Sequence, residues 1–180
     1  KLPLWKVSHG SGELSDAEHE KLLGERLVAC AGTKSVVEAF RDKAMPGHLF
    51  YLCREGNVPL IGRFTSEATP FASKGNGWWS RRYEVIRYAA SPNAVPAMQG
   101  NWTPGGAASF AAVGAQVLPS FQTSVLRPAF KTDLQQLEEL YQASQGKPLE
   151  VSLTQGAIDN GYLAFPLSAS IFPETAHGDR

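Results

Sequence analysis

The chain has 180 residues, and its 17 Lys and Arg balance its 17 Asp and Glu, so net charge alone predicts no partner. Hydrophobic residues make up 43% and charged residues 19%, which excludes a disordered chain and suits one large domain with a core. No apolar run approaches the roughly eighteen residues that a membrane helix needs, so we expect no membrane partner.

The cysteines and histidines give no sign of a metal site or of catalysis. Cys30 and Cys53 are too few for a disulfide framework or a zinc set, and the four histidines lack metal-ligand spacing. The sequence also lacks a P-loop and a nucleophile elbow. We therefore expect no cofactor, no metal and no enzymatic activity, and we favour buried thiols in a cytoplasmic protein over a Cys30–His9 dyad.

The first part of the chain alternates predicted strands and helices. "PLWKVS" (3–8) has the alternation of a short strand, and "SDAE" (15–18) is a capping box that begins a helix through about Leu23. "GTKSVVEAFRDKAM" (32–45) predicts a second helix, because its apolar residues recur on one side.

The central part predicts a sheet. "HLFYLCR" (48–54) and "PLIGRFTSE" (59–67) read as a hairpin, with a bulge at Gly62, and "RRYEVIRYA" (81–89) reads as a further strand. Helices mixed with hairpin-joined strands favour an α+β fold with a curved, largely antiparallel sheet or partial barrel.

The last part is less regular. Residues 91–106 are mostly loop, 108–118 predict a short helix, and "TDLQQLEELYQASQG" (132–146) predicts a clear helix. Two late strands are expected at 149–153 and 161–167.

Aromatic and basic residues meet in "SKGNGWWSRRYEVIRYA" (73–89), where Trp78 and Trp79 follow a glycine-rich loop. Residues 46–90 hold six basic and three acidic side chains, so a neutral total conceals a positive region. An aromatic face beside cations suits a nucleobase and its phosphate, since stacking is worth roughly 1–3 kcal/mol per base.

These residues define a predicted nucleic-acid site. Its members are base-stacking tryptophans, phosphate-binding cations and polar groups that read the base edge: Trp78, Trp79, Trp102; Lys74, Arg81, Arg82; Ser8, His9, Asn76, Asn101. The alternative is that the loop tryptophans close an open end of the sheet and that the arginines pair with Glu67 and Glu84. Neighbouring side chains of an extended loop point opposite ways, so one tryptophan can pack inward while the other faces a ligand.

The order of three segments resembles the EVE/YTH group of PUA-like domains over about residues 4–90. The segments are "LWKVSH", "AFRDKAMPGHLFYLCREGNVPLIGRFTSEA" and "GWWSRRYEVIRYA". "NWTPGGAASF" is similar to the segment after the core in specificity domains of McrB-type restriction systems. The resemblance implies a PUA-like, partly open β-barrel with flanking helices. It also implies that a methylated or hydroxymethylated base, extruded from its helix, is bound in an aromatic cage.

The resemblance places Ser8 and His9 at the pocket, and Trp78 and Trp79 on the loop that contributes cage aromatics. The family often has a tryptophan where this chain has "LVACAGTKS" (27–35), so either Trp102 supplies the missing face or the pocket admits a different base.

These patterns lead to one functional expectation. We interpret residues 1–170 as a single EVE/YTH-like domain, with a core at about 4–90 completed by 91–170, followed by a linker at 171–180. It is expected to read modified DNA by base flipping, as the specificity domain of a modification-dependent restriction protein. It would be fused to or assembled with an AAA+ NTPase or nuclease module in antiphage defence. The alternatives are a YTH/PUA-like RNA-binding module and an interaction domain that binds no nucleic acid.

Overall fold

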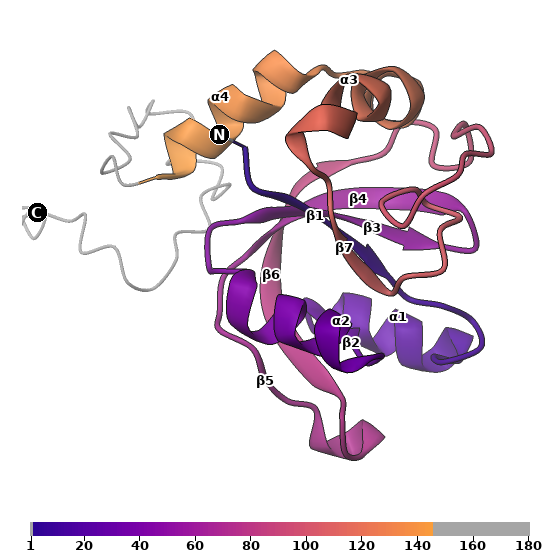
Figure 1. The fold of residues 1–180 in the computed structure, drawn as a ribbon, viewed down its shortest axis with the longest axis vertical. Helices are drawn as coiled ribbons and strands as arrows, with labels where there is room; N and C mark the ends of the chain where they lie inside the picture. The colour runs from indigo at the N-terminus through magenta and orange to yellow at the C-terminus, as the bar shows by residue number, and fades with distance from the viewer. Residues whose placement is uncertain (1, 146–180) are drawn as a thin grey trace, which may run out of the picture. The chain divides into compact units, whose positions relative to one another are not determined.

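The computed structural model describes residues 2–145, in which seven strands form one sheet (Figure 1). The strands are β1 (Leu4–Ser8), β2 (Leu27–Cys30), β3 (Leu49–Arg54), β4 (Asn57–Phe64), β5 (Thr69–Pro70), β6 (Trp79–Tyr88) and β7 (Phe110–Ala112). Their order is β2-β6-β4-β3-β1-β7, and β5 pairs with β6. Within residues 2–145, β1 and β3 run parallel and the other paired strands are antiparallel.

The sheet curves because β6 is shared between two parts of it. Residues 79–82 of β6 pair with β2, and residues 83–88 pair with β4. The register between β4 and β6 shifts between Ile61 and Gly62, which is the bulge that the sequence predicts. A side chain at Gly62 would lie 2.5 Å from Phe50 Cζ, so glycine is needed for this close approach. The predicted α+β fold with a curved, largely antiparallel and partly open sheet is confirmed.

Helices cover both faces of the sheet (Figure 1). Two begin before β3 and two follow β7: α1 (Asp16–Gly24), α2 (Lys34–Glu38) with the π-helical η1 (Ala39–Lys43), α3 (Leu118–Phe121) with the π-helical η4 (Gln122–Phe130), and α4 (Leu134–Ser144). Two 3-10 turns, η2 (Ala72–Lys74) and η3 (Ala115–Val117), complete the described elements. None of the helices within residues 2–145 is long and apolar enough to cross a membrane.

Alternation along the strands divides the core into clusters. On β3, Tyr51 packs into a cluster on the α4 side of the sheet, whereas Phe50 packs into a cluster on the α2 side. A third and smaller cluster, the α1 cluster, contains the buried residues Leu14, Leu22 and Ala29. Each fully buried side chain of this size contributes roughly 1.5–3 kcal/mol, so the two larger clusters hold the sheet and its helices together.

Two helix starts agree with the sequence. The hydroxyl of Ser15 accepts from the Glu18 N–H and the Glu18 carboxylate accepts from the Ser15 N–H, which is the predicted capping box. The helix predicted at 132–146 is α4, and the carboxylate of Asp133 caps it.

Other segments differ from the sequence prediction. Residues 108–118 were expected to be helical, but they form β7 and η3, because Phe110 is buried against Trp5 and Phe40, with ring centroids 4.8 and 5.1 Å away. Strand β2 and the helical segment α3–η4 were not predicted from the sequence. The strands expected at 149–153 and 161–167 and the linker at 171–180 lie outside the described residues.

Candidate nucleic-acid interface

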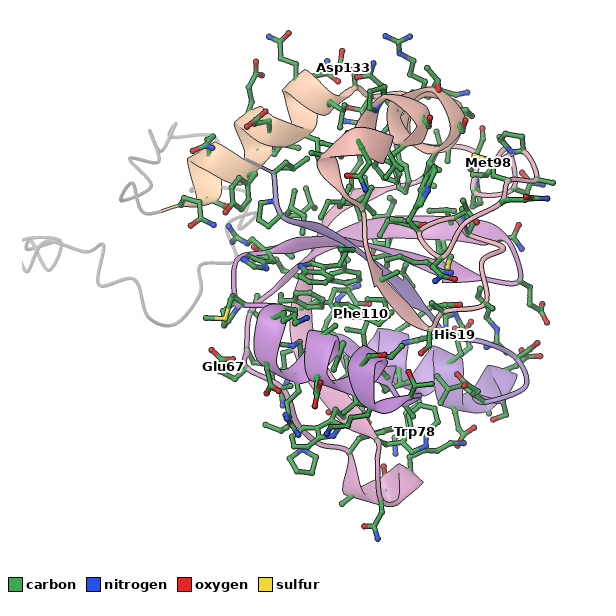
Figure 2. All side chains as sticks on the ribbon, in the orientation of Figure 1. His19, Glu67, Trp78, Met98, Phe110 and Asp133 are labelled. Atoms are coloured by element: carbon green, nitrogen blue, oxygen red, sulfur yellow. The ribbon has the colours of Figure 1, made fainter. Side chains whose placement is uncertain are left out.

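The hairpin formed by β5 and β6 carries the two adjacent tryptophans. Gly75 and Gly77 adopt φ values of 103° and 85°, which side chains disfavour, so the glycines allow the chain to turn tightly before Trp78. Figure 2 shows Trp78 on this hairpin, beyond the main body of the sheet. Alternation puts Trp79 and Arg81 on one face of β6. Trp78, just before β6, packs in the same cluster as Leu27, whose register partner is Arg82, so Trp78 lies on the Arg82 face.

Trp78 is half-buried and packs against the α1 cluster. The ammonium of Lys74 lies 5.6 Å from the centroid of the Trp78 ring, in a cation–π contact. The same ammonium lies 2.6 Å from a carboxylate oxygen of Glu18 in α1. The hydrogen bond from Lys74, with those from the capping residue Ser15, lowers the pKa of Glu18 to about 2.

Trp79 is also half-buried, but it belongs to the large cluster on the α2 side of the sheet. It pairs with Cys30 and Pro70 in the sheet, and the Arg41 guanidinium lies 5.3 Å from its ring centroid. Asp42 holds that guanidinium through two hydrogen bonds of 2.6 Å. Trp79 therefore anchors the hairpin to the body of the domain.

Arg82 is exposed on the face that also bears Trp78. Its backbone N–H donates to Ser66 Oγ at 2.9 Å, while its guanidinium makes no ion pair or hydrogen bond with any residue of 2–145. Arg82 follows Trp78 by four positions, which is about 13 Å along an extended chain. The guanidinium is therefore available to an anion bound near Trp78.

Arg81 was predicted to bind phosphate, and the structure shows that this is wrong. Its side chain is fully buried, beside the rings of Phe40 and Phe64. Its guanidinium donates to four backbone carbonyls, those of Phe40, Arg41, Ala44 and Ser66, at 2.6 to 3.2 Å. Arg81 thus ties η1 and the segment after β4 to β6, and no donor faces solvent.

The prediction that His9 reads a base edge is also wrong, because the side chain is fully buried. The Ala29 N–H donates to its Nε2 at 3.2 Å, and its Nδ1 lies 2.9 Å from Nδ1 of His19. Ser8 is half-buried at the end of β1, where it pairs with Cys53. The structure brings neither residue into the hairpin.

Trp102 does not share a cage with the other two tryptophans. Its ring packs edge-on against Phe121, with centroids 6.4 Å apart, in the cluster on the α4 side of the sheet. The Tyr51 hydroxyl donates to the Trp102 carbonyl, and the buried Lys6 ammonium donates to carbonyls of Asn101 and Gly106 at 3.2 and 2.7 Å. The predicted cage of Trp102 with Trp78 or Trp79 is therefore absent from the structure.

The two cysteines are buried free thiols, as the sequence predicts. Burial raises the pKa of Cys30 to about 12, and its sulfur contacts Ser109 Oγ at 3.7 Å rather than His9. Residues 2–145 contain no cluster of three metal-ligating side chains.

Sequence reasoning missed two basic residues that shape this region. The guanidinium of Arg54 donates to the carbonyls of His9 and Leu14, which fixes the loop between β1 and α1. Lys6 anchors the loop that contains Trp102. The burial of Lys6 could have been predicted from the sequence, because strand alternation places Lys6 on the same face as the buried Leu4.

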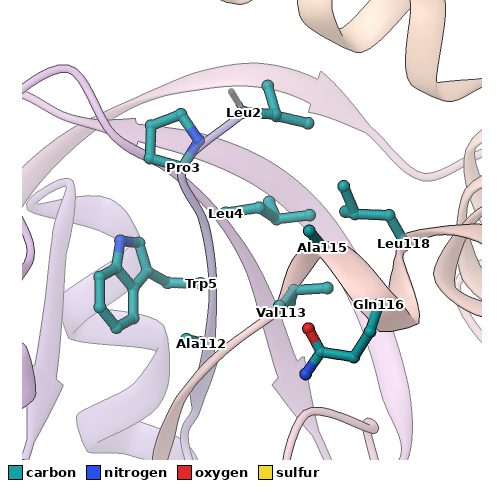
Figure 3. A pocket seen from close by; sticks show the side chains of 10 residues that line it. Leu2, Pro3, Leu4, Trp5, Ala112, Val113, Ala115, Gln116 and Leu118 are labelled. Carbon is teal, nitrogen blue, oxygen red and sulfur yellow. The ribbon is translucent and has the colours of Figure 1, made fainter.

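Cavities in the described part of the chain lie away from these tryptophans. An apolar cavity of about 390 Å³ opens beside β1 and β7, where Leu4, Trp5, Val113 and Leu118 line it (Figure 3). One further cavity lies near α1 and two lie near α4, and none of these four is lined by Trp78, Trp79 or Trp102. The candidate interface is therefore built on the hairpin itself, where Trp78 is half-buried and Arg82 is exposed.

No protein-family model and no curated protein sequence matches the chain. Solved structures with some likeness include protein Atu2648 from Agrobacterium tumefaciens, with 11% identity, 80% of this chain and 94% of that chain covered, and a TM-score of 0.45. The YTH domain of the Zygosaccharomyces rouxii MRB1 protein, solved in complex with N6-methyladenosine RNA, has 14% identity, coverages of 68% and 85%, and a TM-score of 0.42. Rpa0253 from Rhodopseudomonas palustris has 10% identity, coverages of 79% and 93%, and a TM-score of 0.38.

Proposed function

We propose that this domain binds nucleic acid that carries a modified base, and that its ligand is DNA from which the base is flipped out. One observation carries the proposal. The face of the hairpin that bears the half-buried ring of Trp78 also bears the exposed guanidinium of Arg82, and a lysine ammonium lies over the ring. An unpaired nucleotide needs an aromatic surface on which its base stacks and a cation that binds its phosphate. Trp78 supplies the surface, Arg82 supplies the cation, and the base can displace Lys74 from the ring.

Binding exchanges one partner of the Trp78 ring for another. The base takes the place of the Lys74 ammonium, and stacking contributes roughly 1–3 kcal/mol. Lys74 then turns to the phosphate backbone, together with Arg82. Trp78 is better suited to this exchange than Trp79, because Trp78 packs in the smallest cluster, whereas Trp79 packs in a large one and its cation makes two hydrogen bonds to Asp42.

Recognition of a modification needs more than apolar contact. A methyl group on the base adds roughly 0.8 kcal/mol per buried carbon, which is less than a tenfold preference. A strict reader also needs hydrogen bonds that the unmodified base leaves unsatisfied. Asn76 is exposed in the same hairpin loop and offers both a donor and an acceptor, so we assign it this role in place of Ser8 and His9.

We further propose that the domain has no catalytic activity of its own and supplies specificity to a modification-dependent restriction protein. An AAA+ NTPase or nuclease module would then act on the DNA that the domain selects. The support for this assignment is the resemblance of "NWTPGGAASF" to the specificity domains of McrB-type systems.

A gel-shift panel tests the proposal. One duplex sequence carries 5-methylcytosine, 5-hydroxymethylcytosine, N6-methyladenine or no modification, and an RNA of the same sequence with N6-methyladenine competes for binding. We expect one modified duplex to bind most tightly, with an affinity that falls steeply as salt rises. Stronger binding of the RNA would establish the RNA-reader alternative. If no probe binds in a salt-dependent way, the remaining alternative is an interaction domain that binds no nucleic acid.

A further inference from the structure

A second candidate site lies on the other side of α1 from the hairpin. A cavity of about 510 Å³ opens between the start of α1 and the turn that joins β3 to β4. Its charged and titratable lining comes from both elements: Asp16, His19, Glu20, Arg54 and Glu55. The volume lies within the usual range of small-molecule sites, and none of its residues belongs to the proposed nucleic-acid interface.

Hydrogen bonds fix the protonation of the histidine at the base of this cavity. The Ala29 N–H donates to Nε2 of His9, so the proton of neutral His9 resides on Nδ1. That nitrogen lies 2.9 Å from Nδ1 of His19, which must therefore accept. His19 is then neutral as well, and its own proton resides on Nε2.

His19 lines the cavity and is nearly buried. The side chain is only 7% exposed, and Nε2 makes no hydrogen bond with any residue between 2 and 145. Within this range, only Tyr83 Oη is a side-chain nitrogen or oxygen that is fully buried and also lacks a hydrogen-bond partner. His19 Nε2 lacks a partner but does not belong to this class, so solvent reaches it. His19 Nε2 is thus accessible, and because His19 lines the cavity it presents a fixed, unpartnered donor there.

The charges around this donor are mostly negative. The Arg54 guanidinium lies 2.6 Å from an Asp16 carboxylate oxygen and also donates to the Leu14 carbonyl, so it is neutralised and held. Glu20 and Glu55 are exposed and make no ion pair within the described range. With His19 neutral, the cavity keeps two uncompensated negative charges beside one N–H donor.

We propose that this cavity binds an organic cation that carries a hydrogen-bond acceptor close to its charge. Glu20 and Glu55 attract the cation, and the His19 N–H donates to the acceptor. An arginine has this chemistry, with a guanidinium and a nearby carbonyl oxygen. It can come from a free small molecule or from a residue of a partner protein. The proposal does not rest on nucleic-acid binding.

NMR titration of the full chain with N-acetylargininamide tests the proposal, with the ¹⁵N shift of His19 Nε2 as the readout. We expect a saturable shift with this probe and none with N-acetylcitrullinamide, its uncharged analogue. Glu20→Gln should weaken binding about fivefold, since it removes one exposed charge partner. Glu25→Gln is the matched control, because Glu25 is exposed at the end of the same helix and does not line the cavity.

A third probe distinguishes the two sources of the cation. An acetylated Gly-Arg-Gly amide that binds at least tenfold more tightly than N-acetylargininamide supports a residue of a partner protein. Equal or weaker binding of the peptide supports a free small molecule. The proposal is overturned if neither cation shifts the His19 resonance, or if the citrulline analogue shifts it equally.

Discussion

Arg81 and Arg82 are adjacent in β6, yet the side chain of Arg81 is fully buried and that of Arg82 is exposed. Alternation along β6 separates them, because the face that bears Arg81 packs against η1, whereas on the opposite face Ser80 is buried and Arg82 is exposed. Two residues that are identical in the sequence therefore have different roles, one in folding and one in the proposed binding of phosphate.

The first prediction is that Arg81→Met and Arg82→Ala have opposite phenotypes. Arg81→Met leaves four backbone carbonyls, two of them in buried hydrogen bonds, without their donors, so we expect a loss of roughly 3–5 kcal/mol in the free energy of unfolding. Arg82→Ala should change stability by less than about 0.5 kcal/mol and lower the salt slope of DNA binding by about one. Urea denaturation and a salt titration of both variants measure these effects. Normal stability of Arg81→Met would contradict the structure.

The second prediction concerns Trp102, which the structure places away from the hairpin. Trp102→Ala should destabilise the domain, because the ring packs on Phe121, but it should leave the affinity for modified DNA within about twofold. Thermal unfolding and fluorescence anisotropy on the same preparation separate the two effects. A tenfold loss of affinity in a folded Trp102→Ala variant would restore Trp102 to the base site.

The third prediction uses the ion pair over Trp78. Glu18→Gln keeps the capping box, since glutamine can accept from the Ser15 N–H, but it releases Lys74 from its carboxylate partner. Lys74 then leaves the ring more easily and is free to meet phosphate, so we expect nucleic-acid affinity to rise by about twofold to fivefold. Weaker binding by this variant would mean that the Lys74–Glu18 pair is part of the binding surface.

The fourth prediction is a loss of stability in acid. Burial, the neighbouring His19 and the Arg54 charge lower the pKa of His9 to about 3. The unfolded chain takes up this proton below pH 6.5 and the native state does not until about pH 3, so stability falls as the pH decreases through this window. At pH 5 the loss from His9 is about 2 kcal/mol, and the lowered pKa of His19 acts in the same direction.

Urea midpoints at pH 7.5 and pH 5.0 measure this loss. The control is His9→Gln, whose side-chain amide can accept from the Ala29 N–H and donate to His19 without titrating. The variant should show a smaller difference between the two pH values. Equal midpoints for the parent protein at both pH values would refute the assignment of His9 as a buried neutral group.

Local patterns predicted much of the fold. The capping box at Ser15, the bulge at Gly62 and helix α4 follow from spacing and residue type, and the structure confirms them. Strand β2 is only four residues long and is positioned by pairing with β6, which is more than fifty residues away in the sequence. Such long-range pairing leaves no local pattern in the sequence. The same holds for the burial of Phe110, which makes residues 108–118 a strand and turn.

The site was only partly predictable for the same reason. The hairpin with Trp78, Lys74 and Arg82 is a local feature of the sequence, and the structure keeps these residues on one hairpin, with Trp78 and Arg82 on one face. The burial of His9 and Arg81 depends on His19, Ala29 and the carbonyls of η1, which the sequence does not place.

The most direct test of the central claim is the preference for a modified base, measured as the ratio of affinities for modified and unmodified duplexes, in the parent protein and in Trp78→Ala. We predict that the best modified duplex binds the parent protein at least tenfold more tightly. In Trp78→Ala this ratio should fall to near one, while the residual binding keeps its dependence on salt. A ratio that is unchanged in folded Trp78→Ala would contradict the claim that this ring receives the base.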